Sequence, residues 1–159
     1  MPTTIITGST SGIGLEVAKE LAKKNHKLIL VSRNMNKLES TKRILESGNN
    51  INCDIYEHDL SLVRENINFY KEVSKKYENI DLLVNNVGAI FMNREETPEG
   101  LEKTFSLNHM SYFVLSKLFS QQVRPLRIIN VSSEAHRNIR LDYDDLENEN
   151  NYNGWKAYC

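Results

Sequence analysis

Residues 7–14 read Thr7-Gly8-Ser9-Thr10-Ser11-Gly12-Ile13-Gly14, and they stand between a β-branched run and a segment of helical period. A glycine-rich turn at such a junction lets the backbone leave a strand sharply and approach a phosphate group closely. The backbone N–H groups at the start of the helix then face the phosphate, and the helix dipole adds to the attraction. We interpret the stretch as a dinucleotide-binding loop, although its glycine spacing differs from the common G-x-G-x-x-G pattern. The alternative is a glycine-rich turn that holds no ligand.

Five short runs rich in β-branched residues are separated by longer segments of helical period. The runs are Thr4–Thr7, Lys27–Val31, Ile51–Tyr56, Ile80–Val84 and Arg127–Val131. Most are apolar without alternation, as expected for parallel strands that are covered on both faces. With right-handed crossovers they predict an α/β fold of the Rossmann type, a doubly wound parallel sheet with the strand order 3-2-1-4-5. A sixth strand normally follows in this order, so we expect a sheet that is incomplete at its C-terminal side.

The clearest helical stripe runs from Leu101 to Phe119, and Thr97-Pro98 is predicted to open this helix. After Val131 the period is lost, and residues 136–157 are interpreted as a polar loop or insertion. The 159 residues match the size of one domain. We therefore predict a single NAD(P)-binding Rossmann-like domain over residues 1–159.

Composition excludes several classes of function. The 20 Lys and Arg side chains nearly balance 21 Asp and Glu, which argues against a nucleic-acid-binding surface. No apolar run is long enough to span a bilayer, and a strand-like run begins where a secretory leader would lie. Two cysteines, Cys53 and Cys159, predict neither a disulfide framework nor a metal site. We expect a cytoplasmic protein with no metal, no nucleic-acid partner and no membrane span.

The end of the second strand indicates which dinucleotide is bound. An NAD site places an acidic residue there to bond the ribose 2′-hydroxyl, whereas this sequence has Ser32 and Arg33. An arginine fork suits a 2′-phosphate, and a serine hydroxyl can add a donor. We predict that NADP(H) is preferred over NAD(H). The alternative is that Arg33 is an ordinary surface residue.

Several motifs together resemble the short-chain dehydrogenase/reductase family, in the retinol-dehydrogenase-like branch. Thr7-Gly8-x-x-x-Gly12-Ile13-Gly14 is similar to the cofactor loop of that family, and Asp59-Leu60 to its adenine-contacting pair. Asn85-Asn86-Val87-Gly88 resembles its Asn-Asn-Ala-Gly motif, with Val87 in place of the usual alanine. The resemblance also covers Leu107-Asn108-His109 and Asn130 to His136, in the correct order along nearly the whole chain. The expected cofactor-binding residues are therefore Gly8, Ser9, Ser11, Gly12, Ile13, Gly14, Arg33, Asp59, Leu60, Asn86, Val87 and Gly88.

The family resemblance implies hydride transfer between a nicotinamide and a carbonyl or alcohol carbon, with a tyrosine, a serine, an asparagine and a lysine in the site. Ser133 is the expected serine, with Ser132 as its rival and a turn-forming role as the alternative. Asn108 interrupts an apolar stripe, so it either bonds backbone groups structurally or orders a catalytic water. His109 and His136 are more consistent with structural or solvent-facing roles than with catalytic bases.

Two tyrosines compete for the catalytic position. Tyr152 and Lys156 have the Tyr-x-x-x-Lys spacing of the family, but Gly154 and the surrounding asparagines predict a poor helix there. Tyr158-Cys159 resembles the Tyr-Cys-x-Ser-Lys of the branch, and we favour Tyr158. The lysine would then fall four residues later, at position 162, beyond the 159 residues of the chain. The chain is therefore expected to be truncated at its C-terminus and to bind nucleotide with little or no turnover.

The leading functional hypothesis is an NADP(H)-dependent oxidoreductase of the short-chain type. The alternative is a non-catalytic dinucleotide-binding module or partner subunit, and a methyltransferase on a similar sheet is a weaker third. The resemblance suggests a small carbonyl or alcohol substrate of lipophilic character. We also expect an exposed apolar patch where a further helix would cover the sheet, through which the chain could form a homo-oligomer.

Overall fold

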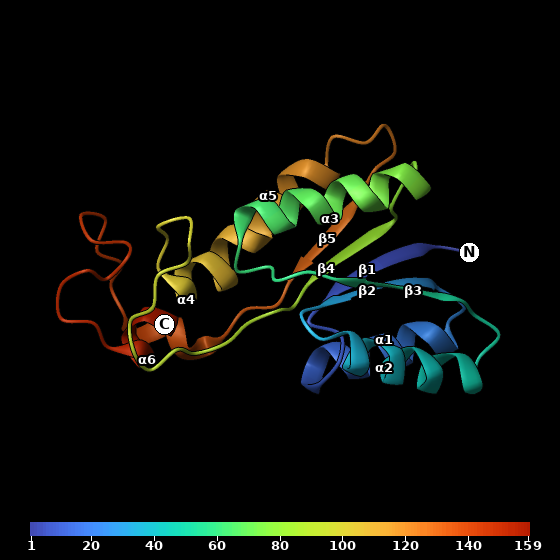
Figure 1. Cartoon of the computed structure of the whole chain (residues 1–159), viewed down its shortest axis with the longest axis horizontal. Helices are drawn as coiled ribbons and strands as arrows, with labels where there is room; N and C mark the ends of the chain where they lie inside the picture. The colour runs from blue at the N-terminus through green and yellow to red at the C-terminus, as the bar shows by residue number, and fades with distance from the viewer.

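Five parallel strands form one sheet in the order β3-β2-β1-β4-β5, as expected from the sequence (Figure 1). The computed structural model describes residues 1–159, apart from the side chain of Asn138. The strands are β1 Thr3–Thr7, β2 Lys27–Ser32, β3 Cys53–Glu57, β4 Leu82–Asn85 and β5 Arg127–Asn130. All neighbouring strands pair in parallel, so their carboxyl ends meet at one edge of the sheet.

Helices cover both faces of the sheet, which gives three layers. Figure 1 shows α1 and α2 together on one face and α3 and α5 together on the other. The long helices are α1 Gly12–Lys23, α2 Met35–Ser47, α3 Val63–Lys76 and α5 Ser111–Phe119. The short ones are α4 Lys103–Phe105, the π-helix η1 Ser106–Met110, the 3₁₀-helix η2 Glu134–Asn138 and α6 Gly154–Tyr158.

The core consists of two apolar clusters, one on each face of the sheet. Alternate residues of a strand point to opposite faces, so Ile5 packs in the cluster with Phe69, and Ile6 in the cluster with Ala18. Four consecutive residues of β2, Leu28–Val31, are fully buried. This explains why the strand is apolar without alternation. Each such Leu, Ile or Val side chain contributes about 1.5–3 kcal/mol by leaving water.

The predicted helix around Leu101 is present, but it begins later than expected. Thr97 to Gly100 form a turn, in which the Gly100 N–H donates to the Thr97 carbonyl oxygen over 2.9 Å. The helix starts at Lys103, and the Glu102 side chain caps it by accepting from the N–H groups of Thr104 and Phe105. The Thr97-Pro98 signal therefore marks a turn that precedes the helix, because proline suits a turn as well as a first helical position.

The interpretation of residues 136–157 as a loop is wrong at both ends. Residues up to Asn138 belong to η2, and Gly154–Tyr158 form α6. The asparagine that counted against a helix in fact starts it, because Asn153 Oδ1 accepts a hydrogen bond from the Lys156 N–H over 2.9 Å. Tyr158 therefore lies at the end of a helical turn.

The outer strand β5 is the most exposed part of the sheet. Its pattern has three exposed residues of four, and Ile129 retains 46% of its exposure. Exposed apolar side chains also occur nearby in the chain, on α5 at Phe113 and before β5 at Val123. Each of these side chains is exposed by itself, and the expected continuous apolar patch stays a prediction.

Candidate functional site

A cleft of about 760 Å³ opens at the carboxyl edge of the sheet, where the loops after all five strands meet. Its size lies within the range of typical cofactor and ligand sites. Ten of the twelve predicted cofactor residues line it: Gly8, Ser11, Gly12, Ile13, Arg33, Asp59, Leu60, Asn86, Val87 and Gly88. The three predicted catalytic residues, Asn108, Ser133 and Tyr158, line it as well. The structure thus brings together side chains that are up to 150 positions apart, from Gly8 to Tyr158.

The glycines of the first loop have two different roles. Gly8 and Gly12 have φ angles of +65° and +52°, a region that side-chain-bearing residues rarely adopt. A Cβ on Gly12 would meet no atom within 4 Å, so the backbone there is open to a ligand. A Cβ on Gly14 would instead collide with the Gly8 carbonyl oxygen and the Asn86 side chain. Gly14 is therefore required for packing behind the loop and does not line the cleft.

Ser9 does not lie where a cofactor contact was expected. It is fully buried, does not line the cleft, and its hydroxyl has no hydrogen-bond partner among the described residues. Because its side chain is buried away from the cleft, Ser9 is not placed to contact a ligand bound there.

Sequence reasoning missed the part played by Thr7. Its hydroxyl oxygen accepts hydrogen bonds from the N–H groups of Asn86 and Val87 over 2.9 and 3.0 Å. The Asn86 side chain completes the link by donating to the Thr7 carbonyl oxygen over 2.9 Å. These bonds hold the loop after β1 against the loop after β4. The position of Thr7 at the end of a strand was the available signal.

Arg33 lies just beyond β2, with an exposed side chain on the rim of the cleft. Among the described residues it forms no ion pair with a carboxylate. The Ser32 and Thr10 hydroxyl oxygens lie 3.5 Å apart beside it. A cation and two hydroxyl groups therefore converge at the end of β2.

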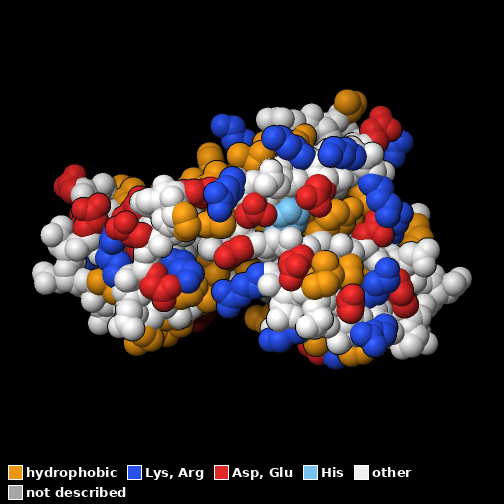
Figure 2. Space-filling model, viewed as in Figure 1, with side chains coloured by type: hydrophobic (Ala, Val, Ile, Leu, Met, Phe, Trp, Pro, Cys, Tyr) orange, Lys and Arg blue, Asp and Glu red, His pale blue; other side chains and the backbone are white. Residues whose placement is uncertain are grey.

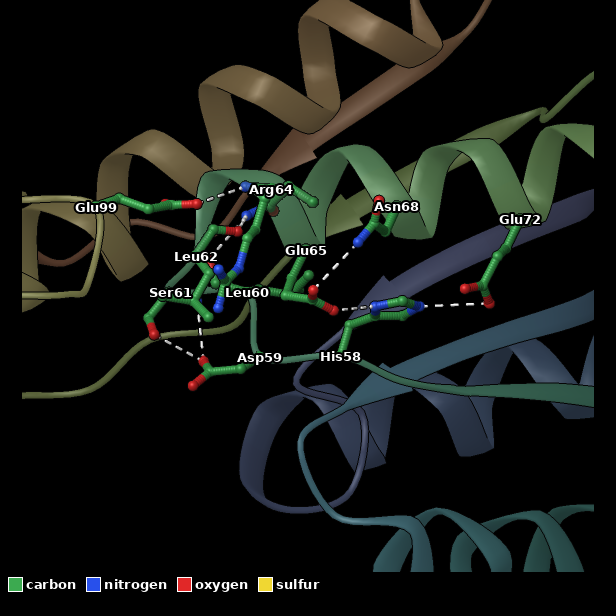
Figure 3. A network of polar contacts seen from close by, with 11 residues as sticks. His58, Asp59, Leu60, Ser61, Leu62, Arg64, Glu65, Asn68, Glu72 and Glu99 are labelled. Carbon is green, nitrogen blue, oxygen red and sulfur yellow. Dashed lines mark hydrogen bonds and ion pairs between the residues drawn. The ribbon is translucent and has the colours of Figure 1, made fainter.

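The loop after β3 is fixed by the polar network in Figure 3. Asp59 Oδ1 accepts from the N–H and the hydroxyl of Ser61, which turns the chain into α3. The His58 ring lies between two carboxylates of α3, with Nδ1 2.8 Å from Glu65 and Nε2 3.4 Å from Glu72. The hydrogen bond with His58 lowers the pKa of Glu65, against a smaller opposing effect of burial. The loop that carries Asp59 and Leu60 is thus anchored to the adjacent helix.

Glu99 lies in the turn Thr97 to Gly100, where the sequence predicted the start of a helix, and its side chain caps α3. Its carboxylate accepts from the Val63 N–H over 2.6 Å and from the Arg64 N–H over 3.0 Å (Figure 3). Leu62 occupies the N-cap position, but its side chain is apolar and cannot accept these hydrogen bonds. The negative charge also lies at the positive end of the helix dipole.

The Asn108 side chain is committed to the backbone of Ala89. Its Oδ1 accepts from the Ala89 N–H over 3.0 Å, and its Nδ2 donates to the Ala89 carbonyl oxygen over 2.8 Å. Of the two roles left open by the sequence, the structural one is present in the geometry. The water-ordering role stays a prediction. Asn108 lies within the π-helix η1, which no sequence signal indicated.

Ser133 caps η2, since its Oγ accepts from the Ala135 N–H over 3.2 Å. Ser133 also lines the cleft, and no hydrogen bond donated by its hydroxyl is present among the described residues. Ser132 lines the same cavity, so the structure leaves both serines within it. His136 Nδ1 donates a hydrogen bond to the Ser133 carbonyl oxygen, and His109 stacks on Phe105 with ring centroids 5.2 Å apart. Both histidines thus have structural contacts.

The two candidate tyrosines occupy different environments. Tyr152 lies outside the cleft lining, and its hydroxyl donates to the Phe91 carbonyl oxygen over 2.8 Å. It also precedes α6, so it does not share a helix face with Lys156. Tyr158 lines the cleft beside Tyr112. Burial, and to a smaller degree the neighbouring Tyr158, raise the pKa of Tyr112 to about 12. Of the two tyrosines only Tyr158 lines the cleft, and its catalytic role stays a prediction.

Charges of both signs are interspersed on the face of the molecule in Figure 2, with no large field of one sign there. Among the described residues, no group of three or more His, Cys, Asp and Glu side chains is placed to hold a metal ion. Within the same residues, none of the helices has the length and apolar character needed to cross a membrane.

Comparisons with known proteins identify what the chain is similar to. A family model described as short chain dehydrogenase matches residues 2–141. Retinol dehydrogenase 13 of Homo sapiens is 34% identical over 163 residues, which cover 99% of this chain and 49% of that protein. The chain spans about half the length of the curated relatives it matches.

Two solved structures show the same arrangement. An uncharacterized protein from Mycobacterium paratuberculosis has a TM-score of 0.85 and 29% identity, over 99% of this chain and 56% of that one. An alcohol dehydrogenase from Thermococcus sibiricus, solved in complex with 5-hydroxy-NADP, has a TM-score of 0.68 and 25% identity, over 77% of this chain and 53% of that one.

Proposed function

The chain belongs to the short-chain dehydrogenase family, and on this premise we propose that it is an NADP(H)-dependent oxidoreductase acting between carbonyl and alcohol. The observation that carries the proposal is the position of Arg33, an exposed cation at the end of β2 on the rim of the cleft. An NAD site needs a carboxylate at this point for the ribose 2′-hydroxyl. A guanidinium instead suits a 2′-phosphate, which it can bind with two parallel hydrogen bonds.

The residues of the cleft fit a dinucleotide along its whole length. The open backbone at Gly12 and the N-terminus of α1 suit a pyrophosphate. Asp59 and Leu60 border the cavity on the side of Arg33, where the adenosine half would lie. Val87 and Gly88 border it further along, toward Ser133 and Tyr158. The 5-hydroxy-NADP bound by the similar alcohol dehydrogenase supports this assignment.

The bound cofactor supplies or accepts the hydride. The proton is the task of the chain's own residues, and we assign it to the Tyr158 hydroxyl, which gives it to the carbonyl oxygen or takes it from the alcohol. Ser133 donates a hydrogen bond to the same oxygen, because its Oγ is already oriented by the Ala135 N–H. A tyrosine with an ordinary pKa near 10 needs a nearby cation for this task at neutral pH. The family resemblance gives that role to a lysine four residues after Tyr158, a position that lies beyond the 159 residues of this sequence.

The substrate is proposed to be a small lipophilic carbonyl or alcohol. Apolar side chains, among them Ile90, Phe91 and Leu107, line the wall of the cleft near Tyr158. The retinol dehydrogenases among the relatives support the same class of substrate.

A second candidate function is a module that binds the dinucleotide without turnover, alone or as a partner subunit. It is favoured by one observation, the commitment of the Asn108 side chain to the Ala89 backbone, which removes it from direct contact with reactants. Both candidates require NADPH binding, and only the first requires NADPH consumption.

The experiment titrates the protein with NADPH by fluorescence and then follows NADPH consumption with a series of lipophilic aldehydes. Saturable binding with turnover that Tyr158→Phe abolishes and Tyr143→Phe preserves supports the oxidoreductase. Tyr143 is a suitable control because it is 81% exposed. Because the expected lysine lies beyond residue 159, binding without turnover supports the module only if a chain extended through that lysine is inactive as well. Absence of NADPH binding overturns both candidates.

A further inference from the structure

Residues Tyr152–Gly154, here called the docking segment, attach α6 to the wall of the cleft. The Tyr152 hydroxyl donates to the Phe91 carbonyl oxygen over 2.8 Å. The same hydroxyl lies 3.1 Å from Thr104 Oγ1, which can donate to it. Tyr152 therefore joins two parts of the molecule, the segment after β4 that contains Phe91 and the helix α4 that contains Thr104.

Gly154 brings the start of α6 into direct backbone contact with that segment. It is buried, and a Cβ at this position would lie 2.6 Å from Met92 Cα and closer still to the Phe91 carbonyl oxygen. Real Cβ atoms do not approach backbone atoms this closely, and backbone cannot move aside as a flexible side chain can. Gly154 does not have a positive φ, so backbone conformation does not require a glycine here. The close packing against Phe91 and Met92 does.

The helix that this segment starts is short, and its first large side chains face solvent. It spans five residues, far below the length at which an isolated helix is stable. Trp155, the first large side chain after the docking segment, is 55% exposed. Further support comes from the Asn153 cap within the docking segment and from packing of α6 against α4. The position of Tyr158, one turn further on, thus depends on where Tyr152 and Gly154 are anchored.

We propose that Tyr152 and Gly154 are positioning residues that set where Tyr158 stands in the cleft, through their contacts with Phe91 and Met92. This inference rests on the proposed function, in which Tyr158 handles the proton. It assigns a task to Tyr152 that differs from catalysis, although Tyr152 has the spacing to Lys156 that is expected of a catalytic pair.

The chain carries its own reporters for a test. Trp155 is the single tryptophan, so its fluorescence reports on α6 alone, and energy transfer from it to bound NADPH reports on its distance from the cofactor. Cys159 follows Tyr158 and lines the cleft, so its rate of reaction with a thiol reagent reports on the end of α6. Cys53 does not interfere, because it is buried and burial raises its thiol pKa to about 11.

The variants are Tyr152→Phe, which removes one oxygen atom, and Gly154→Ala, which adds one carbon. Their matched controls are Tyr143→Phe at an exposed tyrosine and Gly48→Ala, where a Cβ meets nothing within 4 Å. We expect the Cys159 reaction rate to rise about threefold or more in both variants, since the segment opens locally. We expect the NADPH Kd to stay within about twofold of wild type, because the cofactor residues lie on other elements. Energy transfer from Trp155 should fall, while both controls behave as wild type.

An unchanged Cys159 rate together with unchanged energy transfer in Tyr152→Phe overturns the inference. So does an equal change in the controls. If the circular dichroism spectrum shows that Gly154→Ala is unfolded, the result for Tyr152→Phe alone decides the inference, because this variant keeps the aromatic ring and its packing. If wild type fails to bind NADPH, the proposed function is wrong, and the Cys159 rates of the cofactor-free proteins still decide whether the docking segment positions α6.

Discussion

Asn108 pairs with Ala89 in both directions, accepting from its N–H over 3.0 Å and donating to its carbonyl oxygen over 2.8 Å. The side chain thereby replaces a strand partner for the segment that leaves β4. This segment carries Val87 and Gly88 at the cleft and Phe91 at the docking segment. One carboxamide thus supports both the cofactor side and the tyrosine side of the site.

Replacing Asn108 by leucine should destabilise the protein by about 2–4 kcal/mol, because two backbone groups of Ala89 lose their partners. Urea unfolding measures the change. Asn36→Leu is the matched control, since Asn36 is an exposed residue of α2 with no side-chain hydrogen bond among the described contacts. Equal stability of Asn108→Leu and wild type would contradict the bracing role.

Gly12→Ala should mainly weaken NADPH binding, whereas Gly14→Ala should mainly lower the stability of the folded protein. A methyl group on Gly12 enters open space where the pyrophosphate is expected, so NADPH binding should weaken about tenfold or more while stability falls by only about 1–2 kcal/mol from the positive φ. A methyl group on Gly14 collides with the Gly8 backbone and should mainly lower stability. NADPH titration and urea unfolding of both variants, with Gly48→Ala beside them, make the comparison. The reverse pattern would show that Gly12 does not face the ligand.

Glu99→Ala should destabilise α3 by about 1 kcal/mol, through loss of the cap on Val63 and Arg64 and of a charge at the helix N-terminus. Thermal unfolding with Glu78→Ala as an exposed control measures this. Hydrogen exchange at the first turn of α3 should accelerate only in Glu99→Ala. Equal protection there in both variants would exclude Glu99 as the cap.

The hydrogen bond from His58 should make stability depend on Glu65 at acidic pH. The pKa of Glu65 is lower in the folded protein than its ordinary value of 4.5. Its stabilisation is therefore complete above that value and is lost as the pH falls below it. Urea unfolding between about pH 6 and pH 3 should show a steeper loss in wild type than in Glu65→Gln. Parallel curves would mean that the His58–Glu65 pair contributes nothing to the native state.

The sequence alone predicted the strand order and most of the cleft, because unbroken apolar runs and glycine turns report local constraints directly. Gly12 and Arg33 were placed correctly at the cavity, since parallel strands bring their carboxyl ends to one edge. Ser9 was predicted to contact the cofactor but does not line the cleft, because a serine in a glycine-rich turn carries no signal of the side to which it points. Its fully buried hydroxyl depends on neighbours from other segments.

Long-range contacts account for the other differences. Glu99 caps a helix that begins 36 residues earlier in the chain, and no local pattern encodes such a partner. Likewise α6 forms in an asparagine-rich stretch with low helix propensity, because Asn153 caps it and Gly154 packs against Met92. Tertiary contacts override propensity most easily in such short elements.

Arg33 is proposed to make the cleft a site for NADP(H), and the Kd values of NADPH and NADH for wild type and Arg33→Ala test this most directly. We predict that wild type binds NADPH at least about tenfold more tightly than NADH, and that Arg33→Ala loses most of this preference by weakening NADPH alone. Lys37→Ala, on the exposed surface of α2, serves as the charge control. Tighter binding of NADH by wild type, or a preference that survives in Arg33→Ala, would contradict the account.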